Sequence, residues 1–167
     1  MPIGANVTPQ GVRFRVWAPT AQLVAVVSYE NGSPAGSYDL QREDPEGYWS
    51  GVISGSGAGA RYAYSIDGGD PRPDPASRSQ PDGVHGPSEV VDPHAFEWRA
   101  ADWQGVPLAD LIIYEIHVGT ATPAGTFEAL INKLPYFREL GVTALEIMPI
   151  GDFPGGRNWG YDGVLLY

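Results

Sequence analysis

The chain has 167 residues, 43% of them apolar, which is enough to bury a core in one domain or two small ones. Its formal net charge of -10 excludes the basic surface that binds nucleic acid or anionic lipid. The absence of cysteine excludes disulfides and thiolate metal sites and suits a reducing compartment. The N-terminus has no basic region followed by an apolar run, and no stretch approaches membrane-spanning length. We therefore expect a cytoplasmic protein without nucleic-acid or membrane partners.

Short apolar runs separated by turn residues fill the first 66 positions. In the first run Val12, Phe14 and Val16 alternate with Arg13 and Arg15, which is the period of a half-buried strand. No helical pattern lies among the runs, so we predict a small antiparallel β-sandwich. The predicted strands cover residues 11–19, 23–29, 37–41, 47–54 and 61–66.

Gly55, Gly57 and Ala60 fit a variant of the dinucleotide-binding fingerprint. That motif must open a helix whose N-terminus holds pyrophosphate, whereas a predicted strand follows here. A hairpin turn is therefore the favoured interpretation, with nucleotide binding as the minor alternative.

A proline-rich stretch, residues 68–93, follows without any periodicity. It is too varied for a flexible linker, so we expect an ordered segment that wraps against a neighbour. His85 and His94 with Asp92 could in principle bind a metal, but no ligand spacing is present, and structural or exposed histidines are favoured.

The sequence changes character at residues 111–120, LIIYEIHVGT, where both faces of a strand would be apolar. A helical pattern follows at 126–141, and Pro135 should split it into a kinked helix or two short ones. With a second apolar run at 142–149, this makes a βαβ unit with parallel strands. The expected parts are a sandwich over 1–95 that includes the loop 68–93, a connector over 96–110, and an α/β part over 111–167.

Three polar side chains interrupt the two apolar strands of the α/β part. Glu115 and His117 share one face of the first strand, and Glu146 lies in the second. On the inner face of a barrel they would form a polar cluster. Such a cluster either positions a ligand or is a satisfied hydrogen-bond network that supports the site, and the second interpretation is favoured.

The last stretch, residues 151–167, is a glycine-rich loop at the carboxyl end of a parallel strand, where α/β enzymes place their binding groups. Trp159, Tyr161 and Asp162 are the candidates for contact with a ligand. The alternative is an ordinary loop that packs its own aromatic side chains.

These stretches resemble the N-terminal part of alpha-amylase superfamily glycoside hydrolases. FRVWAPTAQLVAVV is similar to the early-set, immunoglobulin-like β-sandwich that precedes the (β/α)8 TIM barrel in branching, debranching and trehalose-releasing members. PDPASRSQPDGVHGPSEVVDP, LIIYEIHVGTATPAGTF and LGVTALEIMPIGDFPGGRNWGYDGV resemble the malto-oligosyltrehalose trehalohydrolase subgroup. The resemblance covers nearly the whole chain.

The resemblance implies hydrolysis of the α-1,4 bond beside the terminal trehalose of a malto-oligosyltrehalose, without an organic cofactor or metal. Tyr161 matches the tyrosine that stacks on a glucose ring next to the scissile bond, Asp162 follows it, and Trp159 lines the same loop. Glu115 and His117 match positions that support the site. We add Glu146 to this supporting group.

The catalytic carboxylates of the family come from later barrel strands than this chain contains. A complete barrel takes about 250 residues, and 59 remain after Leu108 (167 minus 108). None of Glu115, Glu146, Asp152 and Asp162 is assigned a catalytic role, so we expect the chain alone to be inactive. An incomplete barrel exposes sheet edges, which also predicts self-association, domain swapping or packing against the sandwich.

Two alternatives remain open. One is a non-catalytic glucan-binding module, in which sandwich aromatics such as Trp17, Tyr48 or Trp49 contact sugar. The other is a fragment of a related branching or debranching enzyme.

Overall fold

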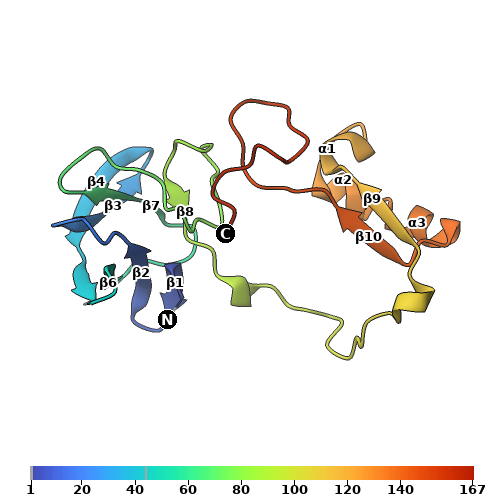
Figure 1. The fold of residues 1–167 in the computed structure, drawn as a ribbon, viewed down its shortest axis with the longest axis horizontal. Helices are drawn as coiled ribbons and strands as arrows, with labels where there is room; N and C mark the ends of the chain where they lie inside the picture. Colours follow the sequence, from blue (N-terminus) through green and yellow to red (C-terminus); the bar gives the residue numbers. More distant parts are fainter. Residues whose placement is uncertain (1, 44) are drawn as a thin grey trace. The chain divides into compact units, whose positions relative to one another are not determined.

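The computed structural model describes residues 2–43 and 45–167 (Figure 1). Contacts between residues divide the chain into two compact units. The first unit is Met1–Phe96 with Gly151–Pro154 and Gly163–Tyr167, and the second is Glu97–Ile150 with Gly155–Asp162. Two short segments near the C-terminus therefore group with the first unit, whereas the sequence predicted one continuous part over 111–167.

The first unit is a sandwich of two four-stranded antiparallel sheets, as predicted. One sheet has the order β1-β2-β6-β5 and the other β4-β3-β7-β8. The strands are β1 (Gly4–Thr8), β2 (Gly11–Trp17), β3 (Val24–Glu30), β4 (Ser33–Asp39), β5 (Gln41–Glu43), β6 (Tyr48–Ile53), β7 (Arg61–Ile66) and β8 (Ser88–Glu89).

The core lies between the inward faces of the two sheets. Val12, Phe14 and Val16 of β2 are buried, as their alternation predicted. Phe14 meets Tyr62 of β7 edge to face, with ring centroids 4.9 Å apart. Trp49 of β6 is only 6% exposed, and its indole donates to the carbonyl of Ala18 at 3.0 Å. The expectation that Trp49 could contact sugar is therefore wrong, because this side chain fills the core.

The structure also corrects the strand assignments. Strands β1 and β8 were not predicted, and the run at 37–41 is divided between β4, which begins at Ser33, and β5. Gly55 and Gly59 have positive φ values of 79° and 83° in the turn that joins β6 to β7. A strand and not a helix follows, so the dinucleotide-binding alternative is wrong. The hairpin interpretation is also wrong, because β6 and β7 belong to different sheets and the turn crosses from one sheet to the other.

The proline-rich stretch packs along β7. Arg72 and Tyr64 exchange two backbone hydrogen bonds of 2.8 Å, and β8 then pairs with the start of β7. Between these points Asp74 is completely buried, and its carboxylate accepts a 2.7 Å hydrogen bond from the Tyr62 hydroxyl. The segment is thus an ordered part of the sandwich.

The second unit contains two parallel strands, as the βαβ pattern predicted. Its order is η2 (Leu108–Asp110), β9 (Ile113–Ile116), α1 (Val118–Ala121), α2 (Phe127–Ile131), α3 (Leu134–Leu140) and β10 (Ala144–Ile147), and a further 3-10 turn, η1 (Pro93–Ala95), belongs to the first unit. Strand β9 is shorter than expected, because the amides of Thr120 and Ala121 bond to the carbonyl of His117 and start α1 there.

Local sequence explains the break between α2 and α3. The Thr126 hydroxyl caps α2 by accepting from the amide of Ala129 at 3.3 Å. Pro135 sits in the first turn of α3, where its missing N–H costs nothing, and Gly141 ends α3 with a φ of 92°. The helices bury Leu130 and Phe137 against β9. With seven residues, α3 is the longest helix among the described residues, and none of these helices could cross a membrane.

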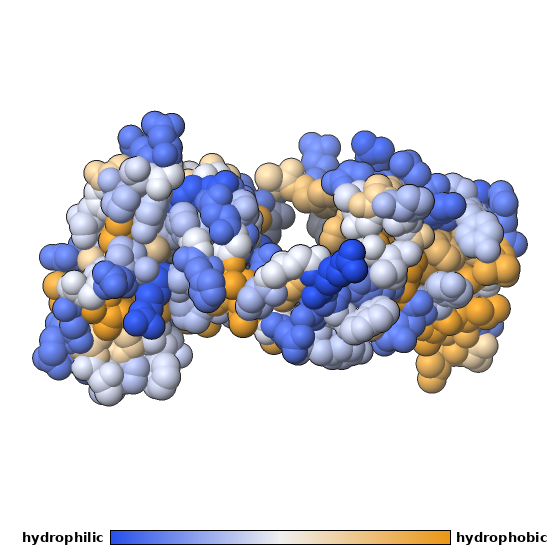
Figure 2. Space-filling view, turned by 90° about the horizontal axis from the view of Figure 1, so that it is seen from above, coloured by the Kyte–Doolittle hydropathy of each residue, from blue (hydrophilic) through white to orange (hydrophobic). Residues whose placement is uncertain are grey.

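The second unit leaves many apolar side chains exposed, and apolar surface is visible over it at the right of Figure 2. The exposed set includes Ile112, Ile113, Ile131, Leu140 and Ile147. Trp98 and Trp103 are exposed as well. A sheet of two strands has too little partner surface to bury both of its faces.

Candidate functional site

The predicted ligand loop and His117 meet at the carboxyl ends of the two parallel strands. His117 directly follows β9, and the loop 157–162 comes after β10. The His117 imidazole Nε2 lies 2.8 Å from the carbonyl oxygen of Asn158, and its ring meets the Trp159 indole edge to face at 5.2 Å. The structure thus brings together two of the residues that the sequence singled out.

One partner of His117 fixes the position of a hydrogen on its imidazole ring. A carbonyl oxygen only accepts, so Nε2 must carry the hydrogen that it donates to Asn158. The other nitrogen, Nδ1, is 3.3 Å from the hydroxyl of Thr120, and that hydroxyl also donates to the backbone carbonyl of His117 at 3.3 Å. His117 thus holds the backbone of the loop through Nε2.

Asn158 organises the rest of the loop. Its Oδ1 accepts hydrogen bonds from the amides of Gly160 at 2.6 Å and Asp162 at 3.4 Å. Its Nδ2 donates to Oδ2 of Asp162 at 2.6 Å. This amide orientation is the one in which the oxygen faces N–H donors and the nitrogen faces a carboxylate.

Gly160 is the tight point of the loop. Its φ is 99°, and a Cβ at this position would collide with the backbone carbonyl of Pro149, just after β10. Only glycine combines this backbone conformation with such a close approach. The loop is therefore folded closely against the end of the strand.

The aromatic side chains of the loop face solvent. Trp159 is 63% exposed and Tyr161 is 72% exposed. Exposed rings beside a carboxylate, that of Asp162, offer apolar faces for sugar rings and an acceptor for sugar hydroxyls. The alternative of a loop that packs its own aromatics fits Trp159 in part, because its edge contact with His117 covers only some of the ring.

Glu115 and Glu146 are register partners on the parallel strands, so they are neighbours on one face of the sheet. Both are exposed in this chain. His117 forms hydrogen bonds with Asn158 and Thr120, and its place in a cluster with the two carboxylates stays a prediction.

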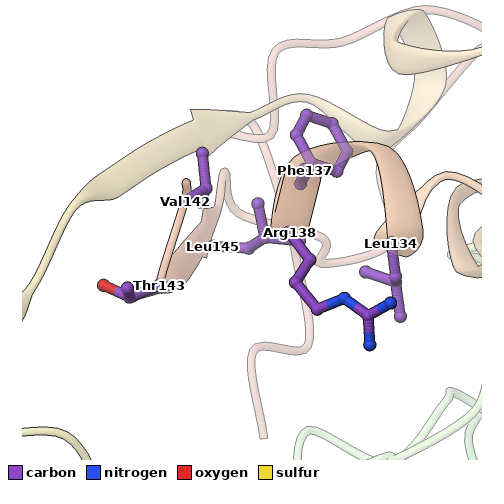
Figure 3. A pocket seen from close by; sticks show the side chains of 7 residues that line it. Leu134, Phe137, Arg138, Val142, Thr143 and Leu145 are labelled. Carbon is purple, nitrogen blue, oxygen red and sulfur yellow. The ribbon is translucent and has the colours of Figure 1, made fainter. Parts of the chain in front are cut away.

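A small pocket of the second unit lies elsewhere, between α3 and the segment that leads into β10 (Figure 3). It is lined by Leu134, Phe137, Arg138, Val142, Thr143, Ala144 and Leu145. None of the candidate ligand residues lines it. The pocket therefore belongs to the packing of α3 on β10 and not to the candidate site.

One of the residues considered for a metal has another partner. Asp92 caps η1 by accepting from the amide of His94 at 2.9 Å. Across residues 2–43 and 45–167, no group of three or more histidine or acidic side chains is arranged to hold a metal ion.

A second aromatic surface lies on the sandwich. Trp17 and Tyr48 are register partners in β2 and β6, and Trp17 is 60% exposed. The Trp17 indole donates to the carbonyl of Glu46 at 3.0 Å, which fixes its ring. Beside it, the guanidinium of Arg15 lies 3.7 Å from the centre of the Tyr48 ring and pairs with Glu43 at 2.8 Å.

Residues 2–95 match the model of carbohydrate-binding module 48, the isoamylase N-terminal domain. The chain therefore belongs to the carbohydrate-binding module 48 family, and its first unit is an early-set sandwich of that kind. Over all 167 residues it is 47% identical to malto-oligosyltrehalose trehalohydrolase of Saccharolobus solfataricus, of which it spans 29%.

Two further proteins that the chain resembles have other names. The chain is 33% identical to the 1,4-alpha-glucan branching enzyme GlgB of Pseudomonas aeruginosa, with 99% of the chain and 25% of that enzyme aligned. A crystal structure of a putative alpha amylase from Salmonella typhimurium matches 99% of the chain with a TM-score of 0.88 and 43% identity. The chain covers 27% of that structure, so it corresponds to a minor part of each of these proteins.

The sequence did not indicate Asn158 or Thr120 as part of the site. The pattern Asn-x-Gly-x-Asp at 158–162 is the signal that could have found the first, because asparagine side chains bond backbone amides two residues on. No comparable signal marked Thr120.

Proposed function

We propose that the chain is the N-terminal part of a glycoside hydrolase that cleaves the α-1,4 bond beside the terminal trehalose of a malto-oligosyltrehalose and releases trehalose. The carrying observation is the 47% identity to a trehalohydrolase over the complete chain, which includes the loop of the candidate site as well as the sandwich. In this proposal β9 and β10 are the first two strands of a (β/α)8 barrel of the alpha-amylase superfamily.

Within that enzyme the loop binds substrate and does not perform the chemistry. Tyr161 and Trp159 would stack on glucose rings, Asp162 would accept from sugar hydroxyls, and Glu115, His117 and Glu146 would support the site. Retaining hydrolysis needs two carboxyl groups about 5 Å apart across the sugar, and we assign neither to this chain. We propose a cytoplasmic location, a malto-oligosaccharide partner, no cofactor, and inactivity of the 167-residue chain alone.

A chimera tests this proposal. The 167 residues replace the aligned segment of the Saccharolobus solfataricus trehalohydrolase, and the product is incubated with maltotriosyltrehalose. Release of trehalose with maltotriose supports the proposal. A folded chimera that releases no trehalose would contradict it.

A glucan-binding module without catalysis is the second candidate. The observation that favours it is the exposed Trp17 beside Tyr48 on a sandwich of the carbohydrate-binding module 48 family. Titration of the chain with maltodextrin, followed by tryptophan fluorescence, tests it. Saturable binding that Trp17→Ala removes supports this candidate, whereas binding that survives Trp17→Ala counts against this surface.

Self-association through the second unit is part of the same proposal. The exposed apolar side chains of β9, α2 and α3 support it, because such surface favours association in water. Sedimentation velocity at increasing protein concentration should show species larger than a monomer. A monomer at all concentrations would contradict it.

A further inference from the structure

We propose that Asn158 is a positioning residue that fixes the ligand loop so that Trp159 and Tyr161 together face an α-glucan. This inference deepens the proposed function and rests on it for the identity of the sugar. The hydrogen bonds within the loop carry it.

Asn158 ties alternate residues of the loop together. Its side chain reaches the amides of Gly160 and Asp162 and the carboxylate of Asp162. Residues 158, 160 and 162 are therefore joined on the inner side of the loop. The residues between them, Trp159 and Tyr161, are left with their rings in solvent.

Two further contacts attach this small unit to the strands. Gly160 is buried and lies against the carbonyl of Pro149 after β10. The carbonyl of Asn158 accepts the hydrogen bond of His117 after β9. Asn158 thus contacts His117, at the end of β9, through its backbone carbonyl. Through its side chain it contacts Gly160, which packs against the segment after β10.

A loop held in its binding conformation loses less conformational entropy when it binds a ligand. Without the Asn158 side chain, two backbone donors and one carboxylate lose their partner, and the aromatic rings can sample many orientations. Asn158 need not contact the sugar to affect its binding. Its effect would pass through Trp159, Tyr161 and Asp162.

Amide hydrogen exchange on the 167-residue chain tests the first half of the inference. In Asn158→Ala the Gly160 amide loses its acceptor, and we expect it to exchange about tenfold faster, as for the loss of one buried hydrogen bond. Asn158→Asp keeps an acceptor oxygen and should leave the Gly160 amide near the wild-type rate, while its charge repels Asp162. Unchanged exchange at Gly160 in Asn158→Ala would overturn the inference.

Two controls separate this result from general unfolding. The amide of Met148 donates to Ile116 at 3.0 Å, so its exchange reports whether β9 and β10 remain paired. Arg157→Ala changes an exposed neighbour and should leave both amides unchanged. If the Met148 amide also exchanges faster in Asn158→Ala, that variant has lost the pairing of β9 and β10. Asn158→Asp is then compared with the wild type, because the proposed hydrogen bonds predict faster exchange at the Asp162 amide and not at Met148.

Kinetics of the chimera test the second half of the inference, which is the effect of Asn158 on sugar binding. Asn158→Ala should raise KM for maltotriosyltrehalose about tenfold and change kcat less, because the loop binds sugar and leaves the chemistry to other residues. Unchanged kcat and KM in an active chimera would overturn the positioning role. A wild-type chimera that releases no trehalose would instead overturn the proposed function, and with it the sugar role of the loop, while the exchange result still decides whether Asn158 holds the loop.

Discussion

The Tyr62 hydroxyl donates a 2.7 Å hydrogen bond to the Asp74 carboxylate, and both side chains are buried in the sandwich. The second carboxylate oxygen accepts from the amide of Ala76 at 2.8 Å, and the hydroxyl of Ser88 accepts from the amide of Asp74 at 3.0 Å. Burial raises the pKa of Asp74, and the hydrogen bonds from Tyr62 and Ala76 oppose this rise. This carboxylate is thus a buried polar connection between β7 and the proline-rich segment, in addition to the backbone hydrogen bonds of Arg72.

Asp74→Ala should lower the free energy of unfolding of the sandwich by about 3 kcal/mol, since it leaves two buried donors without an acceptor. Urea denaturation followed by circular dichroism measures the change. Asp70→Ala, at an exposed position in the same segment, should change stability by no more than about 0.5 kcal/mol. Equal losses for both variants would contradict the role assigned to Asp74.

The pH dependence of stability should carry the signature of Asp74. Because its pKa in the folded state is raised above the usual 3.8, folding takes up a proton between that value and the raised one. The wild type should therefore gain stability relative to Asp74→Asn as the pH falls through this window, by at most about 1.4 kcal/mol per pH unit. Urea midpoints of both proteins measured across this range test the sign, and a wild type that loses stability relative to the variant would be inconsistent with it.

Gly160→Ala should displace the ligand loop, because its Cβ collides with the carbonyl of Pro149 and its φ of 99° is strained for alanine. Amide exchange of Asp162 should become faster, and KM of the chimera should rise. Gly156→Ala is the matched control, since no atom lies within 4 Å of its added Cβ. A loop that tolerates both substitutions equally would show that Gly160 is not its tight point.

The two tryptophans of the sandwich should differ in how much they contribute to its stability. Trp49→Ala removes a buried ring and should cost about 3 to 5 kcal/mol. Trp17→Ala removes an exposed ring and the hydrogen bond to the carbonyl of Glu46, so about 1 kcal/mol is expected. Thermal unfolding of both variants provides the measurement, and a larger loss for Trp17→Ala would show that this ring is structural.

The sandwich could be predicted from sequence where inward residues alternate over several positions. Val12, Phe14 and Val16 show this pattern, and β2 was found where they lie. Strand β1 carries few large apolar residues, and β8 has only two residues. Their pairing depends on neighbouring strands and not on their own pattern, which explains why both were missed.

The candidate site, too, could be predicted only in part from the sequence. The exposed aromatics Trp159 and Tyr161 could be found from their place after an apolar strand. The role of Asn158 depends on a backbone turn that brings two amides to one side-chain oxygen, and composition does not reveal that turn. Trp49 had been grouped with Trp17 because residue type alone does not tell an inward from an outward ring.

The intact mass of the native protein, purified from the cells that make it, tests the central claim most directly. If the chain is the N-terminal part of a hydrolase like its relatives, the mass should be between three and four times 17.9 kDa, because the chain spans 29% of the Saccharolobus enzyme. A native mass of 17.9 kDa would contradict the claim, and a glucan-binding module would then be the better account.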